Sequence, residues 1–395
     1  MPYTCFVMKK KNSILIYALL LILVLILQQA CTYNHLPESN KTIILNWYPA
    51  PANQTIEEFT TGMAWLFSYL GAKLPSNQFE EGVKFIASNK IEINLDELGF
   101  ADFAVNHLET LISQIKQTEE YKVTGGIDAG RFFALCFNST NQYYKITGAA
   151  KTYDEFRSKY ASFMYKTFVC DTSSISSSSR IINYAINDLN IQKSFFISEE
   201  GNGKYSAGTF VRNGYIEAFD YMENGQPRFV IYNQKKELYV PSNSFLHPAG
   251  KPAKCMWCHE SGMQPLFTNT IDIAGFISTT EFLADVQNFT ISLNAFHNQR
   301  SAKLNFKDKK AHTQGEYVYL CFYEPNANRL AGEWSFTVEK VNNLLAGIAK
   351  HNNPEFPFLK DVYYRNQIEK FAPYYSIQVS NEMREASTFE PNYLK

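Results

Sequence analysis

The spacing of apolar residues predicts helices in the first half of the chain. In residues 56–70 and 94–112 apolar side chains recur every three or four positions, which places them on one face of a helix. Thr152 is followed three residues later by Glu155, a spacing typical of a helix start. Residues 56–190 are therefore predicted to form a helical domain.

An alternation of apolar and polar residues replaces this pattern within residues 191–245, where Tyr, Phe, Val and Ile are frequent. A period of two is typical of strands. The Asn-Gly pair at 224–225 lies between two such runs, 215–222 and 227–232, and predicts a hairpin turn with positive φ at both central residues. Residues 191–245 are predicted to form an antiparallel β region.

The helical spacing returns in residues 246–395. Between residues 280 and 299 four large apolar residues and His297 share one helical face. A capping-box spacing beginning at Thr313 and the run 334–348 predict two more helices. The predicted fold class is α+β and predominantly helical, with a small antiparallel β region before the C-terminal part.

The composition is typical of a folded protein. The 395 residues are 45% hydrophobic and 19% charged, which excludes a disordered chain. The formal net charge of −1 removes the broad electrostatic attraction that nucleic-acid binding uses, so no nucleic-acid partner is expected. The Pro- and Tyr-rich segment after Pro354 is predicted to be an extended tail.

Residues 1–30 have the pattern of an export signal. Three lysines at 9–11 precede an apolar run over 14–27, which is shorter than the roughly 20 residues of a membrane-spanning helix. Ala30-Cys31 follows and resembles the lipobox of bacterial lipoproteins. The resemblance implies a lipid on Cys31, a cell-envelope location on the periplasmic side or at the outer membrane, and a tether over residues 31–55. Plain secretion and an uncleaved anchor are the alternatives.

Residues 255–259 read Cys-Met-Trp-Cys-His. Two thiols at this spacing can add to the two vinyl groups of one haem, and the adjacent imidazole can reach the iron. The motif resembles the attachment site of c-type cytochromes. The resemblance implies one covalent haem c, bound through Cys255 and Cys258, with His259 as the proximal iron ligand.

Other chemistries fit these residues less well. A zinc site needs four ligands, and the chain has no second Cys-x-x-Cys and no His-x-x-x-His pair. A thioredoxin-like dithiol is followed by a continuing helix, which Gly262 and Pro265 interrupt.

The sequence does not identify the sixth iron ligand, because no methionine lies at the distance from the motif that is typical of small cytochromes c. His297, on its apolar helical face, is the first distal candidate, although a buried histidine bonded to a carbonyl is an equal alternative. His312 is flanked by lysines and expected to be solvated, and His247 precedes the motif by a loop. The Pro265 carbonyl is a candidate acceptor for the second N–H of His259.

The remaining cysteines, Cys136, Cys170 and Cys321, leave one disulfide possible in an exported protein. Cys136 and Cys321 lie in aromatic runs that favour buried thiols instead.

The sequence therefore predicts a lipid-anchored monohaem c-type cytochrome that transfers electrons to an unidentified redox partner and contacts the membrane through its lipid. One alternative is a haem enzyme of peroxidase or oxidase type with an open sixth position. Another is an envelope binding or scaffold lipoprotein with a structural or sensory haem, because residues 56–245 carry no motif.

Overall fold

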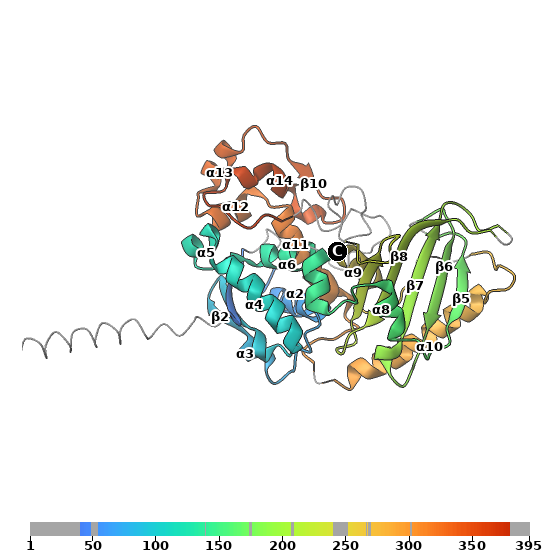
Figure 1. The fold of residues 1–395 in the computed structure, drawn as a ribbon. Helices are drawn as coiled ribbons and strands as arrows, with labels where there is room; N and C mark the ends of the chain where they lie inside the picture. The colour runs from blue at the N-terminus through green and yellow to red at the C-terminus, as the bar shows by residue number, and fades with distance from the viewer. Residues whose placement is uncertain are drawn as a thin grey trace, which may run out of the picture. The chain divides into compact units, whose positions relative to one another are not determined.

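The computed structural model describes residues 40–48, 54–138, 140–173, 176–206, 209–239, 252–265, 267, 270–300 and 302–379 (Figure 1). The predicted export signal, Cys31 and His247 lie outside these residues. From Lys41 onward the chain forms one unit by its contacts.

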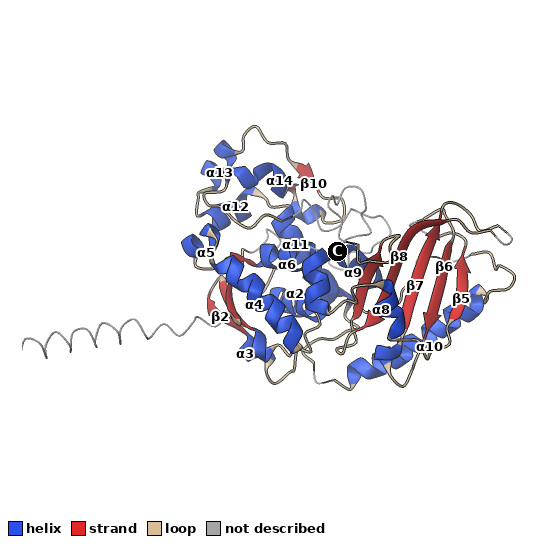
Figure 2. Cartoon of the chain, in the orientation of Figure 1, coloured by secondary structure: helices blue, strands red, loops and turns tan. Residues whose placement is uncertain are grey.

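Helices and strands are interspersed along the described chain (Figure 2). The α-helices are α2 (Ile56–Tyr69), α3 (Phe79–Gly82), α4 (Asp102–Lys116), α5 (Glu119–Thr124), α6 (Ala129–Asn138), α7 (Thr140–Thr147), α8 (Tyr153–Ser158), α9 (Pro252–His259), α10 (Thr279–Asn298), α11 (Lys309–Tyr323), α12 (Ala327–Trp334), α13 (Val338–Leu344) and α14 (Arg365–Ile368). The strands are β1 (Thr42–Asn46), β2 (Val83–Ala87), β3 (Lys90–Asn94), β4 (Ile127–Asp128), β5 (Lys166–Cys170), β6 (Arg180–Ala185), β7 (Phe195–Gly201), β8 (Arg212–Tyr221), β9 (Pro227–Tyr232), β10 (His351–Asn352) and β11 (Asp361–Val362). The α+β class is confirmed, whereas a predominance of helices is not, because sheets make up a substantial part of the fold.

A four-stranded sheet lies where the sequence predicted a tether and a helical domain. Its strand order is β2-β3-β1-β4, with β1 antiparallel to β3 and parallel to β4. The tether assignment of residues 31–55 is therefore wrong for β1, and the helical assignment of 56–190 is wrong for β2, β3 and β4. Each strand has five residues or fewer, and β1 pairs with strands distant in sequence, so the local pattern carries little signal.

The larger sheet is an antiparallel meander in the order β5-β6-β7-β8-β9. Its first two strands also lie inside the predicted helical domain. The predicted β8–β9 hairpin is confirmed, with Gly225 at φ +83°. Asn224 does not share that positive φ; its buried side chain instead donates to the carbonyls of Ser68 and Ala72, so α2 and its C-terminal turn hold this hairpin loop.

One face of this sheet carries an aromatic row that runs across four strands. Tyr184, Phe196, Phe219 and Phe229 are neighbours on paired strands, with ring centroids 4.9 to 5.6 Å apart. The helix predicted at 280–299 is confirmed as α10, and its predicted apolar face, with His297, is buried. Phe282 of α10 packs on Tyr184 with centroids 5.2 Å apart, so α10 lies along the sheet (Figure 1).

The central helices α2 and α11 cross at glycines. A Cβ on Gly62 would lie 2.6 Å from the Gln314 carbonyl oxygen, and one on Gly315 would lie 3.3 Å from the Gly62 oxygen. The missing side chains let the two backbones approach closely. Helix α11 begins after Asp308, whose side chain accepts from two backbone N–H groups, so the predicted start at Thr313 is wrong.

The C-terminal helices form a second hydrophobic cluster around Leu330, Trp334 and Val341. The helix predicted over 334–348 is shorter than predicted: Trp334 is the last residue of α12, Ser335 at φ +54° follows it, and α13 covers Val338–Leu344. The segment after Pro354 is not simply an extended tail, because it includes α14 and the buried Tyr363.

A buried ionic network joins this cluster to the rest of the fold. Arg365 and Arg329 flank the Glu333 carboxylate, and Arg329 also lies 2.5 Å from Asp128.

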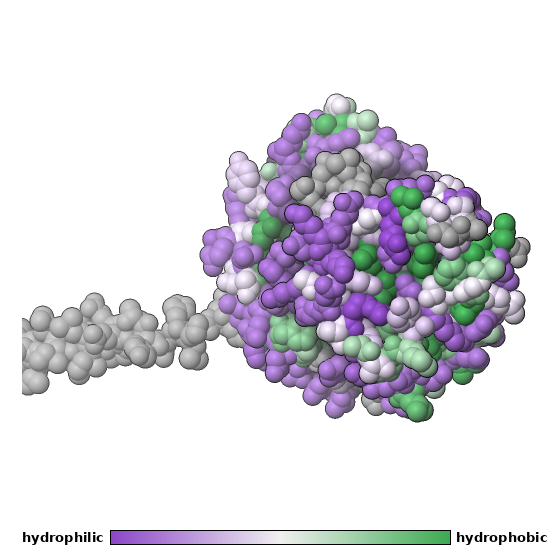
Figure 3. Space-filling model, turned by 45° about the vertical axis from the view of Figure 1, so that its right-hand side comes forward, coloured by the Kyte–Doolittle hydropathy of each residue, from purple (hydrophilic) through white to green (hydrophobic). Residues whose placement is uncertain are grey.

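On the surface view of Figure 3, hydrophilic residues predominate and hydrophobic ones form small separate groups. None of the helices in the described ranges has the length and apolar character to cross a membrane.

Candidate functional site

The three motif residues lie on one face of helix α9. Positions 255, 258 and 259 are spaced i, i+3 and i+4, and side chains at these spacings share a helical face. Pro252 begins the helix, where its fixed φ suits the first turn. Cys255, Cys258 and His259 are all partly buried, so this face is neither fully exposed to solvent nor enclosed in the core.

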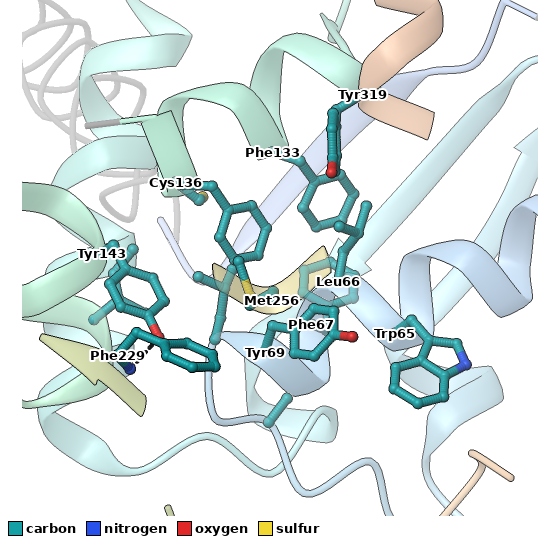
Figure 4. Packing of buried hydrophobic residues seen from close by; sticks show 14 of the residues in the cluster. Trp65, Leu66, Phe67, Tyr69, Phe133, Cys136, Tyr143, Phe229, Met256 and Tyr319 are labelled. Carbon is teal, nitrogen blue, oxygen red and sulfur yellow. Dashed lines mark hydrogen bonds between the residues drawn. The ribbon is translucent and has the colours of Figure 1, made fainter. Parts of the chain in front are cut away.

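The opposite face of α9 is fixed in the core. Met256 and Trp257 are 3% and 4% exposed. Met256 points into the aromatic cluster that contains Phe67 and Phe133 (Figure 4). Trp257 stacks on His312, with ring centroids 5.0 Å apart and an interplanar angle of 28°. Burial of these two large side chains holds the motif helix in one orientation.

The His259 ring lies against the larger sheet at the end of its aromatic row. Its centroid is 5.7 Å from that of Phe229 and 5.6 Å from that of Phe219. Burial, and then the positive charge of Arg180, lower the pKa of His259 to about 4, so its imidazole is neutral at pH 7. Neutral imidazole is the form that binds metals.

The Nδ1 atom of His259 is buried and has no hydrogen-bond partner among the described residues. The expected acceptor, the Pro265 carbonyl, therefore does not hold it. A buried, unpartnered ring nitrogen is uncommon in a core and is a group that a ligand would satisfy.

The donor set fits a c-type haem. Neither Cys255 nor Cys258 forms a disulfide with another described residue, and the two thiols are one helical turn apart on the partly open face. The neutral His259 follows directly. Among the described residues, no three His, Cys, Asp or Glu side chains are grouped to hold a bare metal ion.

His312 is buried, so the expectation that it is solvated is wrong. It is 3% exposed on α11, and its Nδ1 lies 2.5 Å from the Tyr69 hydroxyl oxygen. Of its lysine neighbours in sequence, Lys309 forms an ion pair with Glu260 and Lys310 is exposed. Because His312 packs on Trp257, it lies on the side of α9 opposite to the Cys-Cys-His face.

His297 is also buried, at 6% exposure, on α10. Its Nε2 lies 3.2 Å from the Gly225 carbonyl oxygen, and its ring stacks on Phe306 with centroids 4.0 Å apart. Burial lowers the pKa of His297 to about 4, so this ring is neutral too. The structure thus gives Nε2 a backbone partner. A role of His297 as distal ligand stays a prediction, which requires either that Nδ1 binds the iron or that the contact between Nε2 and Gly225 breaks.

The other cysteines behave as core residues. Cys136, Cys170 and Cys321 are buried, and none forms a disulfide within the described part of the chain. Burial raises the pKa of the Cys321 thiol to about 12, which keeps it protonated.

Comparisons with protein-family models, with curated proteins and with solved structures found no match for this chain. The resemblance to c-type cytochromes and to bacterial lipoproteins therefore rests on residues 255–259 and on the leader.

Proposed function

We propose that this protein is a lipid-anchored monohaem c-type cytochrome of the bacterial cell envelope, which passes single electrons to a redox partner. The observation that supports this proposal is the convergence of Cys255, Cys258 and His259 on one partly open face of α9, while Met256 and Trp257 fix the opposite face in the core. A helix that is held on one side and presents two thiols and a neutral imidazole on the other suits covalent haem attachment.

Cys255 and Cys258 would hold the haem through thioether bonds, and His259 would bind its iron. A bound haem supplies reversible one-electron exchange at its iron. The buried Trp257 and Met256 hold the motif helix in place, and Phe219 and Phe229 limit rotation of the His259 ring. Cys31 would carry the lipid, which places the site at a membrane surface.

The first experiment is a pyridine haemochrome spectrum of protein produced in a host with cytochrome c maturation. The wild-type protein should show haem bound through thioethers, and a haem-stained denaturing gel should retain the band. Cys255→Ser with Cys258→Ser should abolish that band, because no vinyl adduct can form. Cys170→Ser is the matched control: its Sγ already donates to the Thr172 carbonyl oxygen, and the motif thiols remain. Colourless wild-type protein would refute the proposal.

The second experiment separates electron transfer from catalysis. A cytochrome should cycle between two oxidation states in voltammetry with one electron per protein, and its Soret band should not respond to cyanide or peroxide. A response to either ligand indicates an open iron position and favours the haem-enzyme alternative. Membrane attachment has its own test, since Cys31→Ala should release the protein into the soluble fraction.

A further inference from the structure

A cavity of about 390 Å³ lies where several elements meet, away from the motif helix. The residues after α2, the first turn of α4, the C-terminal ends of α7 and α8, residues 192–193 and the β8–β9 hairpin all contribute to its lining. Its volume falls within the range of small-ligand pockets, roughly 300 to 1,000 Å³. None of the motif residues lines it.

The cavity carries more positive than negative charge. Arg228 pairs with Asp220, its Nε 2.8 Å from a carboxylate oxygen, and Lys73 pairs with Glu223 at 2.7 Å. Lys159 and Lys193 also line the cavity, and neither forms an ion pair with another described residue. Two cations thus remain in excess.

Arg228 is a rigid part of this site. Its Nη1 donates to the carbonyls of Thr147 and Gly148 at 2.9 and 3.0 Å, while its remaining groups face Asp220. Its guanidinium lies close enough to Lys159 to act on it: burial and then Arg228 lower the pKa of Lys159, and Asp220 opposes them. An anion placed beside Lys159 would favour the charged form of this lysine and so oppose both effects.

Much of the remaining lining is apolar. Leu70, Ala104, Ile146 and Met222 lie along it, with the half-exposed ring of Phe103 at one side. Gly71, at φ +95°, lets Met222 approach, because a Cβ there would lie 3.3 Å from the Met222 sulfur. A cationic group beside an apolar surface selects ligands that have both features.

We propose that this cavity binds a small organic anion, with a carboxylate or phosphate group directed at Lys159 and Lys193 and a compact apolar body against Met222 and Phe103. The site is independent of the haem proposal. It lies within residues 56–245, where no sequence motif marks it, because its lining residues come from six separate segments.

Isothermal titration calorimetry with phenyl phosphate, benzoate, inorganic phosphate and benzylamine tests the proposal. Phenyl phosphate or benzoate should bind saturably, inorganic phosphate more weakly, and benzylamine not at all. Lys159→Met should weaken binding about tenfold, the usual effect of losing one hydrogen bond between charged groups. Lys122→Met, on the exposed surface of α5 outside the cavity, is the control and should leave binding unchanged.

Because Lys159 follows the last residue of α8 and forms no ion pair with another described residue, its substitution should leave the unfolding temperature unchanged, which separates lost binding from lost folding. Lys193→Met should weaken binding in the same direction. The proposal is overturned if no anion binds saturably, if benzylamine binds as well as benzoate, or if Lys159→Met and Lys122→Met have the same effect. Binding should be the same in the variant that lacks both motif thiols.

Discussion

The crossing of α2 and α11 makes a sharp prediction for Gly62→Ala. The new Cβ would lie 2.6 Å from the Gln314 carbonyl oxygen and 2.8 Å from its carbonyl carbon. Both are backbone atoms of a buried helix, so neither can rotate away, and the two helices must separate. These helices carry Tyr69 and His312, whose contact supports Trp257 of the motif helix.

The expected cost follows from two opposing effects. Overpacking a closed core costs roughly 1 to 3 kcal/mol. Alanine is favoured over glycine within a helix by up to about 1 kcal/mol. Because the new Cβ would contact backbone atoms, which cannot rotate away, we expect the overpacking cost to lie in the upper part of its range. The net loss of unfolding free energy should be about 2 kcal/mol.

Urea unfolding, followed by circular dichroism, measures this quantity. Gly332→Ala in α12 is the matched control, because its nearest neighbour would be Tyr48 at 3.6 Å, an ordinary contact. That variant should be as stable as the wild-type protein or up to about 1 kcal/mol more stable. If Gly62→Ala behaves like Gly332→Ala, the close backbone approach at this crossing is refuted.

Three further predictions concern the buried groups and one helix start. Burial raises the pKa of Glu333, but Arg365 and Arg329 outweigh it and lower that pKa from 4.5 to about 2. The stability from this pairing is therefore present above pH 4.5 and is lost as the pH falls towards 2, by about 3 kcal/mol. In urea unfolding, Glu333→Gln should lack this pH dependence. If the unfolding free energies of the variant and the wild-type protein change equally with pH, the pairing is contradicted. Thr55→Ala removes the side chain that caps α2 and should cost about 1 kcal/mol, whereas an unchanged urea midpoint would argue against the cap. Burial raises the pKa of the Cys136 thiol, so a maleimide should label it only after unfolding, and peptide mass mapping that finds label in native protein would count against its burial.

Local sequence patterns gave correct predictions where the pattern depends only on residues that are close together in sequence. The apolar face of α10 was predicted residue by residue, because a helix repeats every 3.6 residues whatever it packs against. The β8–β9 hairpin was predicted from a signal that is also local, the Asn-Gly pair between two alternating runs. In contrast, β1 was assigned to a tether, because its five residues gain their place only by pairing with β3 and β4.

The sequence alone determined the spacing of the two thiols and the imidazole, since that spacing is a covalent property of residues 255–259. The tertiary structure decided which way these side chains face, because Met256 and Trp257 must be buried against residues far along the chain. It also decided that His312 lies in the core, although its neighbours in sequence are lysines. Burial depends on contacts between distant segments, such as Tyr69 with His312, and no local pattern records them.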